Sequence, residues 1–251
     1  MLLFLAYFKV CIFLDKVIFC MKKVSIALLG IFICSSAFAK WYDGGYLSQE
    51  QITDTTSLIG APPSSDSIAF LNDKAISEAT FSLDKDNPKY QQAINHSDDN
   101  LDDVMSEFSE VVGQSIDKEN TPYIYSLLEK STNDANNFKD KAKNHYKRKR
   151  PFVYFDRKPC STTEDGTTYS YPSGHSTRAW NDGLILASLK PQKANEILDM
   201  SKSMAESRVI CGAHWPSDIK AAQTVAMTEF TILQTNLEYR QDFTNALAEI
   251  K

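Results

Sequence analysis

Apolar residues recur at the spacing of an α-helix through most of the chain beyond residue 65. The clearest case lies in residues 101–112, where the i, i+3, i+4, i+7 spacing predicts one buried helix face. This face comprises Leu101, Val104, Met105, Phe108, Val111 and Val112. An earlier helix is expected over residues 68–79, with the Asp66 side chain as its N-cap.

Four further helices are predicted on the same grounds. One opens at Thr121-Pro122, because proline is tolerated in a first turn, and continues until Pro151 stops it. The other three cover residues 175–189, residues 192–211 and the segment from Pro216 to Leu237. Alternating apolar and polar runs bounded by hairpin turns are largely missing. The expected fold class is therefore all-α, as a single-domain helical bundle.

Two segments carry no helical pattern. The polar stretch from about residue 40 to residue 65 is expected to be a loop. The stretch from Phe152 to Tyr171 is expected to be a long irregular loop, and loops of that length inside compact domains usually serve function.

The first 39 residues are interpreted as a leader rather than as part of the fold. Residues 21–39 combine Lys22 and Lys23, an apolar run and a small-residue cleavage site at Ala39, which is the layout of a secretory signal peptide. Residues 1–20 are expected to be an over-extended start or an N-terminal extension, because charged residues interrupt them before they reach the length of a membrane span. The domain proper is then residues 40–251, exported to the periplasm or secreted.

Charge and cysteine content refine this picture. Removal of residues 1–39 leaves 23 basic and 31 acidic residues, a net charge of −8, so nothing global attracts nucleic acid or an anionic bilayer. Cys160 and Cys211 are the two cysteines left, and in an oxidising compartment they are expected to form a disulfide, with two separate buried thiols as the alternative.

A cluster of six positive charges ends the long predicted helix, within residues 141–150. Lys143 and Arg150 are seven residues apart, close to two helical turns, so both can point at one spot from the same face. A phosphate would suit that spot, because arginine offers a planar fork and lysine a point charge. The alternative is a solvated helix face.

Two more segments suggest anion chemistry. In Tyr171-Pro172-Ser173-Gly174-His175, Ser173 can cap a helix whose free N–H groups point at an anion, Gly174 allows close approach, and His175 has the pKa range of a general acid. In residues 206–218, Arg208 adds a guanidinium, and Asp218 lies one turn beyond His214, where it can orient the imidazole as a nucleophile. Purely structural roles, with Asp218 as an ordinary first-turn acid, remain the alternatives.

Taken together, the three segments resemble the three-part signature of the type 2 phosphatidic acid phosphatase superfamily, which vanadium haloperoxidases share. The segments read Lys-x6-Arg-Pro, Pro-Ser-Gly-His and Ser-Arg-x5-His-x3-Asp. Further residues, including Tyr46-Leu47, residues 67–73 and residues 206–212, resemble the secreted class A bacterial non-specific acid phosphatases. The resemblance spans nearly the whole of residues 40–251, and it implies that superfamily's helical bundle.

The resemblance also implies a metal-independent mechanism without a cofactor. Lys143, Arg150 and Arg208 would hold the phosphoryl oxygens, together with Ser173 and the Gly174 N–H. His214, oriented by Asp218, would attack phosphorus to give a phosphohistidine. His175 would protonate the leaving alkoxide and later activate water.

The implied partners are small phosphomonoesters such as nucleotides, sugar phosphates and aryl phosphates, with no nucleic acid, no membrane insertion of the mature chain and homo-oligomers as a family precedent. An apyrase-like hydrolase of nucleoside di- and triphosphates on the same site remains an alternative. A vanadium haloperoxidase and a non-catalytic anion-binding module are further alternatives.

Overall fold

The computed structural model describes residues 41–98, 100–162 and 164–251. The predicted signal peptide and the preceding extension lie outside these residues. Every regular element among the described residues is a helix, which confirms the all-α prediction. No helix there is long and apolar enough to cross a membrane.

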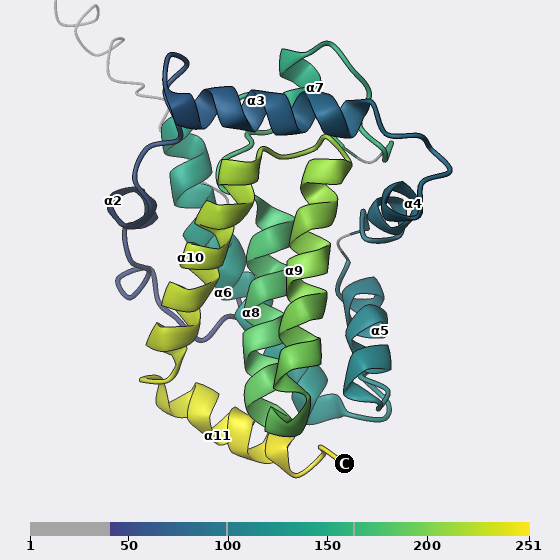
Figure 1. Ribbon diagram of the computed structural model, residues 1–251. Helices are drawn as coiled ribbons and strands as arrows, with labels where there is room; N and C mark the ends of the chain where they lie inside the picture. Colours follow the sequence, from purple (N-terminus) through teal and green to yellow (C-terminus); the bar gives the residue numbers. More distant parts are fainter. Residues whose placement is uncertain (1–40, 99, 163) are drawn as a thin grey trace, which may run out of the picture. The chain divides into compact units, whose positions relative to one another are not determined.

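The helices keep the following bounds (Figure 1). They are α2 (Thr55–Ile59), α3 (Ile68–Phe81), α4 (Pro88–Asn95), α5 (Leu101–Val112), α6 (Pro122–Tyr146), α7 (Pro151–Tyr154), α8 (Gly174–Leu189), the 3-10 turn η1 (Pro191–Lys193), α9 (Ala194–Ile210), α10 (Pro216–Leu233) and α11 (Leu237–Leu247).

Helix α8 is the centre of the bundle, because it packs against α6, α9 and α10. These helices bury one continuous apolar core, in which Phe108, Phe138 and Ile185 are fully enclosed. Helix α3 lies across the turn that joins α9 to α10, and α11 packs on α6 and α8 (Figure 1). The start of α8, the end of α9 and the start of α10 therefore meet at one end of the bundle.

Four expectations about helix ends were wrong. Ser67, not Asp66, caps α3, since its side chain accepts the Phe70 N–H. The last predicted helix is two, because Asn236 caps a new helix by accepting the Tyr239 N–H. The two expected loops are also interrupted: the first contains α2, and α7 takes up the start of the second.

The fourth error concerns the basic segment. Helix α6 ends at Tyr146, where Lys147 adopts a left-handed conformation with φ of 50°. Arg150 is then the N-cap residue of α7 rather than a continuation of α6. The argument that Lys143 and Arg150 share one helix face was therefore wrong, although both approach the same loop, as shown below.

Candidate active site

The turn between α9 and α10 places the first group of predicted site residues. Ala213 and His214 both donate their backbone N–H to the carbonyl of Arg208, at 3.0 and 3.1 Å. Gly212 makes this turn possible, because its φ is +72° and a Cβ there would lie 2.3 Å from the ring of Phe81. The tight turn brings the His214 ring close to the Arg208 helix end.

A pair of contacts fixes the His214 imidazole. Asp218 Oδ2 lies 3.4 Å from Nδ1, on the side where an orienting carboxylate was predicted. On the other side, Nε2 lies 3.0 Å from Nη1 of Arg150. His214 is 1% exposed, and burial together with the charges of Arg150, Lys143 and Arg208 lowers its pKa well below the ordinary value. The imidazole is therefore neutral, with a lone pair available at Nε2.

Ser170 is a site residue that the sequence did not indicate. Its hydroxyl donates to Oδ2 of Asp218 and lies 3.3 Å from Nδ1 of His214, so it sits between the two. Asp218 Oδ2 also accepts the Trp215 N–H at 2.8 Å. Burial nevertheless raises the pKa of Asp218 to about 6, against the lowering influence of Arg148.

The predicted cations converge on the loop before α8. Lys143 donates from Nζ to the carbonyl of Tyr169 at 2.8 Å, and Arg150 donates to Thr168 at its hydroxyl and carbonyl. Arg150 also reaches the carbonyl of Ala213 at 3.2 Å. Burial and the positive charge of Arg150 lower the pKa of Lys143 to about 7.

The start of α8 is tied directly to the start of α10. Ser173 caps α8 as predicted, since its hydroxyl accepts the N–H of Ser176, and its own N–H donates to the Asp218 carbonyl. The missing side chain of Gly174 serves another purpose than expected, because a Cβ there would meet the methylenes of Lys139 at 2.8 and 3.1 Å.

His175 follows at the half-buried first turn of α8. Its Nε2 lies 3.2 Å from the carbonyl of Ser97. Because a carbonyl only accepts hydrogen bonds, this nitrogen carries the proton. The charge of His175 contributes to the lowered pKa of His214, which places the two imidazoles within electrostatic range of one another.

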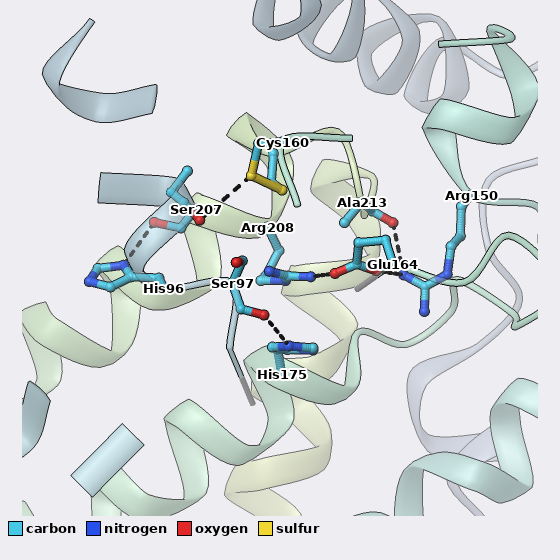
Figure 2. The surroundings of a disulfide bond; sticks show 11 residues. His96, Ser97, Arg150, Cys160, Glu164, His175, Ser207, Arg208 and Ala213 are labelled. Atoms are coloured by element: carbon cyan, nitrogen blue, oxygen red, sulfur yellow. Dashed lines mark hydrogen bonds and ion pairs between the residues drawn. A yellow bond between two sulfur atoms is a disulfide. The ribbon is translucent and has the colours of Figure 1, made fainter. Parts of the chain in front are cut away.

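Figure 2 shows a carboxylate between the two arginines. Glu164 accepts from Nη1 of Arg150 at 3.0 Å and from Nη2 of Arg208. The disulfide between Cys160 and Cys211, which the structure confirms, lies beside this group. The sequence gave no signal for Glu164, since nothing distinguishes it from other acids in a polar loop.

Comparison with known proteins agrees with this geometry. Residues 127–240 match the PAP2 superfamily, which covers all the phosphate-site residues named above. The chain is 33% identical to a non-specific acid phosphatase of Providencia stuartii, over 91% of this chain and 97% of the relative. A non-specific acid phosphatase of Salmonella typhi is 31% identical, over 81% of this chain and 82% of the relative.

Two further matches complete the set. An acid phosphatase of Zymomonas mobilis is 31% identical, over 79% of this chain and 76% of the relative. The first transmembrane PAP2 type phosphatidylglycerolphosphate phosphatase from Bacillus subtilis has a TM-score of 0.49 and 18% identity, over 68% of this chain and 87% of that one. The chain is a PAP2 superfamily enzyme. Within that superfamily it belongs to the non-specific acid phosphatases.

Proposed function

We propose that this acid phosphatase hydrolyses small phosphomonoesters through a phosphohistidine at Nε2 of His214. The observation that carries the proposal is the state of this imidazole, which is buried, neutral and held between Asp218 and Arg150. Asp218 at Nδ1 favours the tautomer whose lone pair is on Nε2. That nitrogen forms a bond to phosphorus while the ester P–O bond breaks.

The cations supply the stabilisation that phosphoryl transfer requires. Arg150 and Arg208 present guanidinium forks beside Nε2 of His214, and the Lys143 ammonium is the third positive group. Their charge would offset the negative charge on the non-bridging oxygens in the transition state. Local charge thus allows a protein of acidic composition to bind an anionic ester.

His175 is proposed as the acid and then the base. Its ring donates a proton to the leaving alkoxide in the first step. In the second step water attacks phosphorus, its proton passes to His175, and the P–N bond breaks to release phosphate. The Ser97 carbonyl supports this role, because it favours a protonated Nε2 before the substrate arrives.

Hydrolysis of p-nitrophenyl phosphate at about pH 6 in excess EDTA tests the proposal. We expect turnover that EDTA leaves intact, vanadate inhibits, and His214→Ala abolishes by several orders of magnitude. His145→Ala is the matched control, because His145 is exposed at the end of α6. Activity that requires a metal, or that survives in His214→Ala, would overturn the mechanism.

The role of His175 has a sharper test. p-Nitrophenolate leaves without a proton, whereas a sugar alkoxide needs one, so His175→Ala should reduce hydrolysis of sugar phosphates far more than the first step with the aryl ester. The aryl ester should give a burst of nitrophenol and a labelled enzyme whose phosphate is stable to base and labile to acid. Equal losses for both esters would contradict the assignment.

We further propose that residues 21–39 direct the chain to the periplasm and are removed after Ala39. The Cys160–Cys211 disulfide supports export, since disulfides persist in oxidising compartments. The first residue of the protein recovered from a periplasmic fraction should then be Lys40. Recovery from the cytoplasm with an intact N-terminus would contradict this.

A further inference from the structure

The Glu164 carboxylate lies where the phosphoryl group is proposed to bind. Its two oxygens are divided between the arginines, with Oε2 3.0 Å from Nη1 of Arg150 and Oε1 bonded to Nη2 of Arg208. The side chain is 5% exposed, so the carboxylate is inside the site rather than at its rim. Figure 2 draws the three side chains in this order.

The contacts of Glu164 are those that a substrate would need. A carboxylate presents two anionic oxygens to guanidinium groups much as a phosphoryl group presents two of its non-bridging oxygens. Nη1 of Arg150, which donates to Glu164, also lies 3.0 Å from the nucleophilic nitrogen of His214. The carboxylate and a phosphoryl group positioned for attack would therefore compete for the same donors.

The loop that carries Glu164 is anchored on both sides of it. Cys160 is bonded to Cys211 through the disulfide, and its backbone N–H donates to the Cys211 carbonyl at 2.9 Å. Thr168 accepts from Arg150 on the other side. These anchors hold the carboxylate near Arg208, which ends only three residues before Cys211. Tethering gives an internal ligand a high effective concentration.

Charge balance explains why the carboxylate stays there in the free enzyme. Arg150 and Arg208 have side chains that are 8% and 0% exposed, and buried cations need an anionic partner. Glu164 supplies that partner until an anionic substrate arrives. The neighbouring residues 165–168 are exposed, so the surface side of the loop offers space for the displaced side chain.

We propose that Glu164 is an internal competing anion that occupies the phosphoryl site of the free enzyme, sets the affinity of the site for phosphate and is displaced by the substrate. This inference rests on the proposed phosphate site of Arg150 and Arg208. Glu164 is a specificity-determining residue in this scheme: only a group anionic enough to outcompete a tethered carboxylate enters.

Calorimetric titration with inorganic phosphate, combined with steady-state kinetics, tests the proposal. In Glu164→Gln and Glu164→Ala we expect the Kd for phosphate and the KM to fall about three- to tenfold, because the fraction of open sites rises. The kcat changes little. Asp165→Asn is the matched control, since it removes the same charge from the same loop, but its carboxylate bonds to Thr167 and not to the arginines.

The competing results are distinct. A residue that only supports the arginines, or that assists catalysis, would on removal raise the Kd or lower the kcat, and either result overturns the proposal. An unchanged Kd in both variants does so as well. If Glu164→Gln does not fold, Glu164→Asp gives the same readout, because the shorter side chain cannot span both guanidinium groups.

A second pair of variants separates this inference from the proposed site. Arg150→Met and Arg208→Met should each weaken phosphate binding, with the fold checked by circular dichroism. If they do so while the Glu164 variants bind like the wild type, only the internal-anion proposal fails. If neither affects phosphate binding, the phosphate site itself is misassigned.

Discussion

Nη1 of Arg148 donates to Oδ1 of Asp218 at 2.6 Å, on the side of the carboxylate that faces away from His214. The same guanidinium donates from Nη2 to Asp73 of α3 at 2.7 Å, and it is 8% exposed. Asp73 in turn accepts the N–H of Ser217 at the start of α10. Arg148 thus connects the carboxylate that orients the nucleophile to a helix on another side of the molecule.

Replacing Arg148 should shift the acid limb of the pH profile. Arg148 opposes the effect of burial on Asp218, so in Arg148→Met the pKa of Asp218 rises further above about 6. The carboxylate is then protonated at higher pH, and His214 loses its partner there. We expect kcat/KM at pH 5.5 to fall more than kcat/KM at pH 7.5.

Breaking this buried pair should also cost about 3–5 kcal/mol of unfolding free energy, measured by urea denaturation. Arg157→Met is the control, because Arg157 is exposed. Arg148→Lys keeps one charge but not the forked geometry, so it should recover part of the activity. A uniform loss at every pH would indicate a structural role alone.

Lys143 should define the alkaline limb. Burial and the charge of Arg150 lower its pKa to about 7, so the ammonium is charged below that pH and neutral above it. Phosphate binding that uses this charge should weaken as the pH rises through about 7, and KM should increase. In Lys143→Arg, where the charge persists, KM should stay flat to pH 8. Lys149→Arg, at an exposed position, should leave the wild-type rise in place.

Two buried acids predict that the fold is more stable in mild acid. Burial raises the pKa of Asp182 to about 7 and that of Glu229 well above its ordinary value, and no hydrogen bond from a described residue reaches either carboxyl. The folded state binds these protons more tightly than the unfolded chain. The free energy of unfolding therefore falls as the pH rises from about 4 to 7.

The double variant Asp182→Asn/Glu229→Gln removes this dependence. It should gain at least about 1 kcal/mol over the wild type at pH 8 and nothing at pH 4, since one pKa unit corresponds to about 1.4 kcal/mol. Thermal unfolding across this pH range measures the difference. An exposed pair, Asp199→Asn/Glu110→Gln, controls for net charge. Equal shifts at both pH values would refute the assignment.

Gly212→Ala should impair the turn that holds His214. The positive φ strains any L side chain, and the new methyl group would collide with the ring of Phe81. We expect a loss of about 1–3 kcal/mol in stability and a fall in kcat. Adding Phe81→Ala should relieve the collision but not the backbone strain, so a double-mutant cycle separates the two. Full recovery would mean that φ is unimportant here.

The sequence predicted the elements whose local chemistry is explicit. The apolar stripe of residues 101–112 became α5, Pro122 opened α6, and Ser173 capped α8. The helix past Gln234 was misread because the apolar spacing continues to Leu237, whereas the capping side chain of Asn236 starts a new helix there. Leu237 is 76% exposed, so the pattern that suggested a core position was accidental.

The site followed the same division. The prediction that Lys143 and Arg150 act together rested on a continuous helix, yet their proximity comes from a loop that receives both side chains. Arg148, one of a run of cations, could not be told from a solvated residue, because its partners Asp73 and Asp218 are 75 and 70 residues away. Ser170 and Glu164 likewise act through long-range contacts that no local pattern encodes.

The Cys160–Cys211 link couples the redox state of the surroundings to the readiness of the enzyme. Where thiols stay reduced, the loop bearing Glu164 is released from the helix that ends at Arg208, and the cationic site loses a built-in constraint. The chain then completes its site only after oxidation. A hydrolase with broad appetite for phosphate esters would in this way be kept from full competence among the metabolites of the cell that makes it.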